Sequence, residues 1–182
     1  MNFFDIIIFV ISFLTNLPDT INTVNQLDVP SYMGSWHQVY TNRVTSLVFG
    51  ENSSCITTNY RLIEDEKFNN KIDMNFKLKN NESYINHSAI GYTLNNSHPG
   101  ELVAHFYNDN VAFKYLIIEN GPLVDNQYQY SIVTDDLGIM LFVFIRNLND
   151  FLLYQKDIDV VLENYNFTDY FRQPLIVDNT NC

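Results

Sequence analysis

Short hydrophobic runs separated by turn residues constrain the fold of this chain more than any other sequence feature. The clearest run is Lys71–Lys79, in which apolar side chains occupy the even positions and polar side chains the odd ones. A period of two is typical of a strand with one face toward water and the other toward an apolar interior. Similar runs occur at 36–44, 55–63, 84–94, 101–107, 110–119, 127–134 and 138–146. Eight strands at this spacing predict an all-β, antiparallel up-and-down barrel.

After Arg146 the hydrophobic period changes from that of a strand to that of an α-helix. One face of the predicted helix collects the apolar side chains of this segment, which are Phe151, Tyr154, Ile158, Val161, Leu162 and Tyr165. We expect Asp150 to cap the N-terminus of this helix, because Asp is a favoured N-cap residue. The helix should pack outside the barrel, and Leu175–Val177 should follow it as a short edge strand.

Composition and charge limit the classes of partner. The 182 residues are 46% apolar and 15% aromatic, which is enough for one domain with a sizeable core, and no low-complexity linker divides them. We therefore expect a single domain at 21–182. Ten basic residues against twenty-one acidic ones give a net charge of -11. Such a chain is repelled by phosphate backbones and anionic lipid surfaces, so we expect no nucleic-acid partner and no stable membrane insertion.

Residues 1–20 are predicted to be a secretory signal peptide. The first fourteen carry one charge and are otherwise almost wholly apolar, a length that suits a signal peptide and is too short to span a bilayer. No Lys or Arg precedes the apolar run and no Ala-x-Ala cleavage site is visible, so an uncleaved anchor is the alternative. We expect cleavage between Thr15 and Asn22 and an extracellular mature protein.

Two further features fit an exported chain. Cys55 and Cys182 are most simply paired in a disulfide, with two free thiols as the alternative. Asn-x-Ser/Thr sequences predict surface glycosylation at five positions, which are Asn52, Asn81, Asn86, Asn95 and Asn166.

Three segments, in this order and spacing, resemble the lipocalin family. Tyr32–Trp36 looks like the first lipocalin motif, with its Gly-x-Trp, Cys55–Leu62 looks like the second strand, and Phe144–Asn147 looks like the last. Within the family, the cysteine before strand two and the closing cysteine are similar to those of apolipoprotein D and the insect bilin-binding proteins. The second disulfide common in that group is absent, because the chain has two cysteines.

The chain departs from the family between the sixth and seventh strands. Lipocalins usually carry Thr-Asp-Tyr there, whereas the corresponding turn here reads Glu119–Pro122. A Thr134–Asp135 pair falls one turn later along the chain. Either the motif has drifted, or the assumed strand register is off by one hairpin.

The resemblance implies a structural pair at the closed end of the barrel, in which Arg146 packs over Trp36. Above this pair, strand alternation predicts an aromatic and aliphatic wall that lines a ligand cavity. Its predicted members are Tyr60, Leu62, Met74, Phe76, Phe113, Tyr115, Tyr128, Tyr130, Met140, Phe142 and Phe144. The alternative is a barrel filled by these side chains, since eight strands permit either arrangement.

Two functions remain open at this point. The first is a secreted protein that binds, carries or sequesters a small hydrophobic or amphipathic ligand, such as a lipid, sterol or pigment, without a cofactor. The second is a scaffold whose open-end loops bind a protein or a cell surface. We expect no enzymatic activity, because the four histidines lack metal-ligand spacing and no nucleophile motif occurs.

Overall fold

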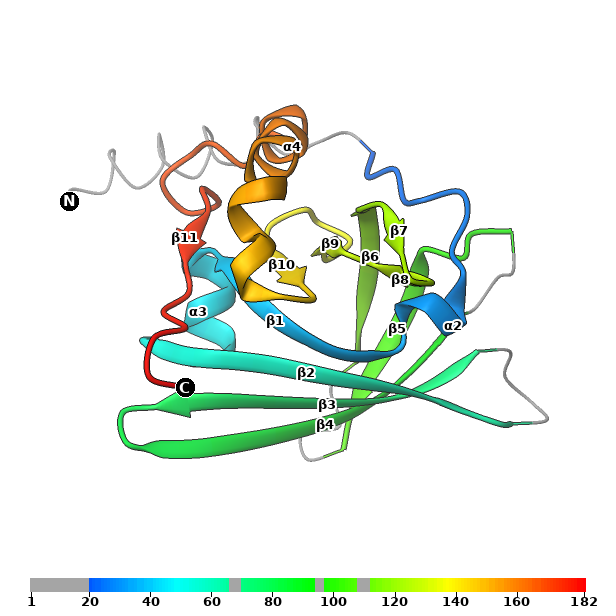
Figure 1. The fold of residues 1–182 in the computed structure, drawn as a ribbon, viewed down its shortest axis with the longest axis horizontal. Helices are drawn as coiled ribbons and strands as arrows, with labels where there is room; N and C mark the ends of the chain where they lie inside the picture. The colour runs from blue at the N-terminus through cyan, green and yellow to red at the C-terminus, as the bar shows by residue number, and fades with distance from the viewer. Residues whose placement is uncertain (1–19, 66–69, 94–96, 108–111) are drawn as a thin grey trace, which may run out of the picture.

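Eight antiparallel strands form a closed barrel in the computed structural model, which describes residues 20–65, 70–93, 97–107 and 112–182 (Figure 1). The predicted signal peptide lies outside these ranges, apart from its last residue. The barrel strands are β1 (Gly34–Thr41), β2 (Ser53–Ile63), β3 (Lys71–Asn80), β4 (Ser83–Thr93), β5 (Glu101–Phe106), β6 (Ala112–Asn120), β9 (Tyr130–Thr134) and β10 (Phe142–Ile145). The predicted fold class is confirmed.

Strand pairing follows chain order and then closes on itself. Each strand pairs with the next, β6 pairs with β9, and β10 returns to β1, with His37 opposite Ile145. On the other side of β1, the two-residue strand β11 (Leu175–Ile176) adds a short edge. A small separate hairpin, β7 (Leu123–Val124) and β8 (Gln127–Tyr128), fills the connection between β6 and β9.

The strand register resolves the question raised by the missing motif. Because β6 ends at Asn120 and pairs with β9, the turn at Glu119–Pro122 does follow the sixth strand. The Thr134–Asp135 pair instead opens the turn between β9 and β10. There the Asp135 carboxylate accepts hydrogen bonds from the backbone of Ile139 and Met140, each at 2.8 Å. The predicted strand order therefore holds, and this turn has its own polar support.

Two hydrophobic clusters divide the molecule between the inside of the barrel and the space beneath α4 (Phe151–Asn164). Alternate residues of β10 supply both clusters: Phe142 and Phe144 face inward, whereas Val143 and Ile145 face the helix. The helix packs outside the barrel as expected, with Ile158 and Leu162 fully buried. This second cluster covers one outer wall of the barrel.

The start of α4 differs from the sequence prediction in one detail. Asp150 occupies the N-cap position, but its side chain makes no capping hydrogen bond. A short 3-10 helix, η1 (Leu148–Asp150), precedes α4, and the side chain of Asn147 accepts the hydrogen bond that starts it. The capping hydrogen bond is therefore made by Asn147, one turn before the predicted position, because η1 already orders the chain before α4 begins.

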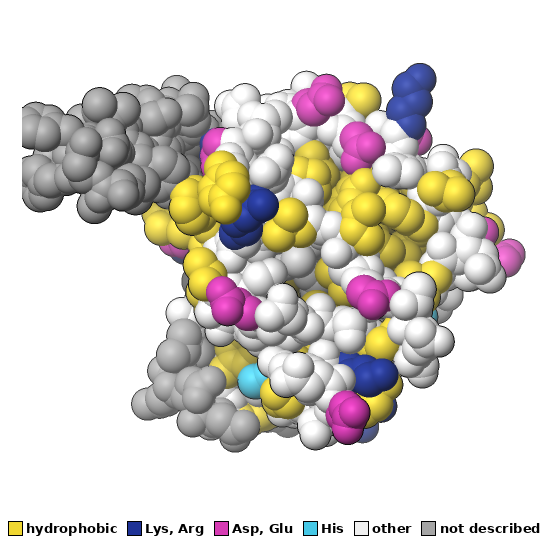
Figure 2. Space-filling model, turned by 90° about the vertical axis from the view of Figure 1, so that its left-hand side faces the viewer, with side chains coloured by type: hydrophobic (Ala, Val, Ile, Leu, Met, Phe, Trp, Pro, Cys, Tyr) yellow, Lys and Arg dark blue, Asp and Glu magenta, His cyan; other side chains and the backbone are white. Residues whose placement is uncertain are grey.

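Short helices mark the two ends of the barrel in Figure 1. The four-residue helix α2 (Val29–Tyr32) lies at one end, and α3 (Arg43–Phe49) lies at the other, near β11. Figure 2 looks onto the side of the molecule that carries α3 and β11 and shows hydrophobic side chains gathered on that face. In the described ranges, no helix has the length and apolar character needed to cross a bilayer.

The predicted disulfide is confirmed. Cys55, at the start of β2, is bonded to Cys182 across a sequence separation of 127 residues. The backbone N–H of Cys55 also donates to the carbonyl of Asp178 at 2.8 Å. The C-terminal segment is thus fixed to the barrel near α3.

Candidate functional site

The closed end of the barrel is sealed by a cation–π contact between Arg146 and Trp36. The guanidinium carbon lies 3.6 Å from the centroid of the indole ring, and the indole is completely buried. The indole N–H donates to the carbonyl of Tyr32 at 3.0 Å. A guanidinium stacked on an aromatic face contributes about 0.5–2 kcal/mol, so this contact is a structural element of the floor.

Hydrogen bonds from Arg146 reach four backbone carbonyls in three elements at the same end. Its guanidinium donates to the backbone carbonyls of Ser31, Tyr32, Ser35 and Tyr128 at 2.9–3.1 Å. Burial lowers the pKa of Arg146 to about 10, which leaves the group charged at neutral pH. Arg146 therefore acts as a cross-link between α2, β1 and β8.

Above the floor, buried phenols form a polar layer inside the barrel. The hydroxyl groups of Tyr60 and Tyr115 lie 2.7 Å apart, and the hydroxyl of Tyr32 lies 3.0 Å from that of Ser131. Burial raises the pKa of all three phenols, so they stay neutral. Because these hydroxyls bond to one another, the layer supports the core and leaves its polar groups largely satisfied.

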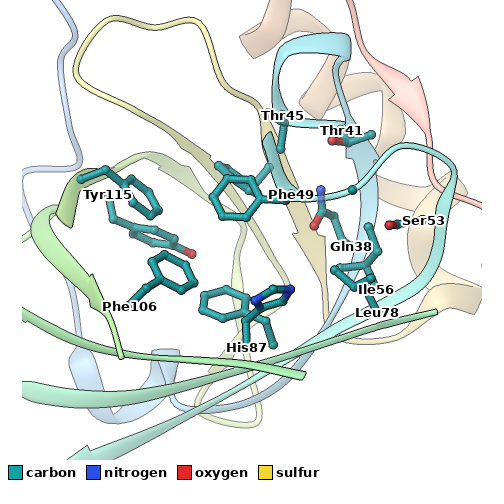
Figure 3. Close-up of a pocket in the computed structure, with 14 residues that line it drawn as sticks. Gln38, Thr41, Thr45, Phe49, Ser53, Ile56, Leu78, His87, Phe106 and Tyr115 are labelled. Carbon is teal, nitrogen blue, oxygen red and sulfur yellow. The ribbon is translucent and has the colours of Figure 1, made fainter. Parts of the chain in front are cut away.

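The open end holds a cavity of about 50 Å³ above this layer (Figure 3). Its lining contains many aromatic rings and a smaller number of polar side chains. The lining residues are Gln38, Thr41, Thr45, Phe49, Gly50, Ser53, Ile56, Phe76, Leu78, His87, Phe106, Phe113, Tyr115 and Phe142. Pockets for small organic ligands usually measure about 300–1,000 Å³. The barrel interior is thus mostly filled by side chains, and a small cavity remains near its mouth.

Phe49, the last residue of α3, closes the cavity from above. Its ring lies 5.6–6.1 Å from the rings of Phe106, Phe113 and Phe142, at tilted or edge-on angles. The neighbouring residues Leu47 and Val48 point away from the barrel and are 61% and 58% exposed. Phe49 is therefore the apolar side chain by which α3 enters the barrel.

Polar groups lie on one side of the cavity and aromatic rings on the other. In Figure 3, Gln38 and Ser53 lie toward one side, whereas Phe106 and Tyr115 lie toward the opposite one. The side-chain amide of Gln38 donates to the carbonyl of Tyr40 at 3.1 Å. Within the described residues, the buried hydroxyl of Ser53 has no hydrogen-bond partner. The cavity can thus accept an apolar group at one side and a hydrogen-bonding group at the other.

Most of the residues predicted to line the cavity lie inside the barrel. Phe76, Phe113, Tyr115 and Phe142 line the cavity itself. Five others belong to or pack against the interior cluster without lining the cavity, namely Tyr60, Met74, Tyr128, Met140 and Phe144. Among these, Tyr128 lies near the floor, where its hydroxyl accepts from the backbone N–H of Asp28.

Two of the predicted cavity residues lie elsewhere. Tyr130 faces outward into the cluster beneath α4, with its ring 5.7 Å from that of Tyr154. Because α4 covers the outer face of β9, Tyr130–Thr134 is buried on both sides and gives no alternation from which to infer direction. Leu62 is 43% exposed, because β1 begins at Gly34, opposite Tyr60, and gives no cover to later residues of β2.

Sequence reasoning missed Phe49 and the polar lining from Gln38, Thr41, Thr45 and Ser53. The predicted strand 36–44 ran into the start of α3, so the helix was not foreseen. A capping signal was present: the side chain of Asn42 accepts from the backbone of Thr45 at 2.9 Å, and Gly50 ends the helix with φ 133°. Asn at the N-cap and Gly after the last turn are the usual marks of a short helix.

The predicted glycosylation sites occupy surface positions where the structure describes them. Asn52, Asn81, Asn86 and Asn166 are exposed. Three of these, all except Asn86, have φ between 54° and 60°, which is typical of turns. Asn95 lies outside the described residues.

The described residues provide little for metal or thiol chemistry. No group of three or more His, Cys, Asp or Glu side chains within them is placed to hold a metal ion. Both cysteines are in the disulfide, which leaves no free thiol.

Comparison with solved structures adds independent evidence on the fold. The cockroach major allergen Per a 4 aligns with a TM-score of 0.58 and 19% identity, over 91% of this chain and 98% of the allergen. The siderocalin Ex-FABP, described as having dual ligand specificities, aligns with a TM-score of 0.51 and 8% identity, over 84% of this chain and 93% of that protein.

This chain has the lipocalin fold. A closed antiparallel barrel of eight strands with a C-terminal helix outside it is shared with these proteins along nearly their whole length. At the level of sequence, the chain matches no family model and no curated protein. With identities this low, the lipocalin likeness concerns the fold and leaves the ligand to be argued from the cavity.

Proposed function

We propose that this protein is a secreted lipocalin that binds a small hydrophobic or amphipathic molecule at the open end of its barrel. The observation that supports this most directly is the cavity of about 50 Å³ that Phe49 and Tyr115 help to line. A barrel with a purely structural role has no need of a mouth lined by aromatic rings on one side and an unpartnered buried hydroxyl on the other. The sealed floor makes this mouth the route of entry.

Extracellular function is part of the same proposal. The disulfide between Cys55 and Cys182 is typical of proteins that fold in an oxidising compartment. We propose in addition that residues 1–20 are cleaved and that glycans are attached at the four exposed Asn-x-Ser/Thr sites and at Asn95. Membership of the lipocalin family, near apolipoprotein D and the bilin-binding proteins, belongs to the proposal as well.

Native mass spectrometry of the protein secreted by eukaryotic cells tests the binding function. We expect a fraction of the protein to carry an additional non-covalent mass that is released on denaturation. The same spectra report signal cleavage, disulfide formation and glycan occupancy. A secreted, folded barrel that carries no extra mass and binds none of a panel of apolar compounds would contradict the binding role.

A cavity-filling substitution tests where the ligand lies. Ile56→Phe adds volume at the cavity wall and should reduce the bound fraction at least tenfold. Thr57→Phe is the matched control, because Thr57 adjoins Ile56 in β2 but is not among the residues that line the cavity. Equal loss of bound mass in the two variants would place the ligand outside this cavity.

A second candidate function has one observation in its favour. Leu47, Val48, Tyr170 and Ile176 are each exposed by more than half, and Leu47 and Tyr170 line the same surface groove beside α3. Apolar exposure of this kind at one end of the molecule fits binding of a protein partner through the open-end loops. Substituting Leu47 and Ile176 with Ser should abolish such binding and leave the bound small molecule unchanged.

A further inference from the structure

The cavity volume and its chemistry together define what the proposed site can hold. An apolar cavity of about 150 Å³ is sufficient to bind benzene, whereas this one measures about 50 Å³. The site therefore has to enlarge before it can hold a ring. Among the lining side chains, that of Phe49 comes from α3 and not from the barrel wall.

The attachment of α3 is uneven along its length. Its first turn is held firmly: the amide of Asn42 donates to the carbonyl of Ile139 at 2.8 Å, and the backbone of Leu141 donates to the hydroxyl of Thr45 at 2.8 Å. Its second half exposes Leu47 and Val48 and ends at Gly50, whose φ of 133° is a backbone conformation available to glycine. Moving Phe49 outward has to break the backbone hydrogen bond from Gly50 to the Ser46 carbonyl at 2.9 Å, while the first turn keeps its bonds to Ile139 and Leu141.

Phe49 marks the position that a ligand ring would take. Its ring meets the rings of Phe106, Phe113 and Phe142 in the tilted and edge-on arrangements that aromatic pairs prefer. If Phe49 leaves, the space it vacates and the existing cavity join into one site of the size of a phenyl ring with a short substituent. The walls of that site are already complementary to an aromatic ring.

Charge and hydrogen bonding narrow the ligand further. Among the described residues that line the cavity, none is Lys, Arg, Asp or Glu. An ammonium group would lose its hydration here without an opposite charge in return, and a carboxylate would find only the imidazole of His87 as a partner. Gln38 and the unpartnered hydroxyl of Ser53 instead suit one neutral polar substituent.

We propose that the ligand of this site is an uncharged aromatic molecule with one hydrogen-bonding substituent, and that Phe49 occupies the place of its ring in the ligand-free protein. This inference rests on the proposed function and specifies its ligand class. Binding then requires Phe49 to be displaced. The measured affinity is therefore the intrinsic affinity multiplied by the fraction of protein in which the Phe49 ring has left the site.

Four matched probes test the ligand class by titration calorimetry or ligand-observed NMR. Benzyl alcohol has the proposed chemistry, cyclohexylmethanol lacks the aromatic ring, benzylamine adds a positive charge, and benzoate adds a negative charge. We expect benzyl alcohol to bind at least tenfold more tightly than the other three. Binding of cyclohexylmethanol or of either ion as tight as that of benzyl alcohol overturns the ligand class and leaves the binding function standing.

Variants of Phe49 test the displacement. Phe49→Ala should bind benzyl alcohol at least tenfold more tightly than the unmodified protein, because no ring has to leave. Phe49→Leu should shift affinity in the same direction by less, and it serves as the test if the alanine variant does not fold. Leu47→Ala is the matched control on the outward side of α3 and should change nothing. Equal affinity of the Phe49 variants and the unmodified protein overturns the displacement.

Failure of the inference can be separated from failure of the function. If no probe binds to the folded proteins but native mass spectrometry still finds a retained molecule, the ligand class is wrong and the binding function stands. If no probe binds and the secreted protein is also empty, both proposals fail.

Discussion

The two ends of the barrel are closed by opposite means. At the closed end, the cross-link lies inside: Arg146 covers Trp36 and bonds four backbone carbonyls. At the open end, the longest-range cross-links lie outside, beside the hydrogen bonds of Asn42 and Thr45 that hold the first turn of α3. There the C-terminal segment is joined to the barrel by the disulfide from Cys55 to Cys182 and to α3 by a hydrogen bond from Arg43 N–H to the Phe171 carbonyl.

This difference separates stability from binding within one small fold. A buried, hydrogen-bonded charge fixes its surroundings because any movement leaves polar groups without partners. Aromatic rings without such bonds, like those around Phe49, can be displaced at a cost of dispersion and apolar contact alone. Because the disulfide and the bond from Arg43 lie outside the open end, neither of them fixes the aromatic rings that surround the cavity.

The largest effect should come from removing the floor. Trp36→Ala deletes the largest fully buried side chain and should lower the free energy of unfolding by about 3–5 kcal/mol, as measured by urea denaturation. Ligand affinity of the protein that remains folded should change less than threefold. Unchanged stability would show that the floor does not carry the role assigned to it here.

Removing the disulfide should give the second-largest loss of stability. The paired substitutions Cys55→Ser and Cys182→Ser should cost about 2–5 kcal/mol, because the bridge restricts a long loop in the unfolded chain. We expect hydrogen exchange to increase mainly in α3 and β11, whereas the backbone around Trp36 should stay protected. Equal loss of protection at both ends would contradict the separation between them.

Arg146→Met should have a smaller effect, confined to the closed end. The variant keeps apolar cover over Trp36 but leaves four backbone carbonyls without their donor. We expect a loss of about 2–3 kcal/mol in the free energy of unfolding. Arg61→Met is the control, because Arg61 is a largely exposed member of a surface ion pair, and it should cost less than about 1 kcal/mol.

The smallest effect should be the acid sensitivity of the segment behind α3. Burial raises the pKa of Asp169, but hydrogen bonds from Arg172 and from the backbone of Phe171 outweigh it, so the pKa lies below its usual value. The stability from this carboxylate is therefore present above about pH 4, where the unfolded group ionises, and is lost as the pH falls through the lower folded value. Asp169→Asn should remove this part of the pH dependence, and the two unfolding curves should converge once the pH lies below the folded pKa of Asp169. A constant difference between them would contradict the assignment.

The sequence predicted the barrel well where one face of a strand meets water. In β3, the alternation over Lys71–Lys79 correctly placed Met74 and Phe76 inside. It failed for Tyr130 because α4 buries the outer face of β9 and removes the polar half of the pattern. Hydrophobic periodicity arises because one face of a strand meets water. Where both faces of a strand are buried, the pattern does not show which side chains point into the barrel.

The site itself was only partly predictable. Inward rings such as Phe113 and Phe142 follow from strand parity, but the size of the space between them depends on how all the side chains pack, which no local pattern records. Phe49 was missed because α3 spans seven residues, fewer than two full turns, which is too short for an amphipathic pattern to stand out. The cap residues Asn42 and Gly50 were the only sequence signal from which this helix could have been predicted.

The order in which the disulfide partners are synthesised has a consequence for production of this protein. Cys55 is translated 127 residues before Cys182, and strands β3 to β10 lie between them. Throughout that interval Cys55 is an unpaired thiol that can react with another chain. Rapid expression in an oxidising compartment should therefore yield covalent dimers through Cys55, and slower synthesis, or added thiol–disulfide exchange capacity, should restore the monomer.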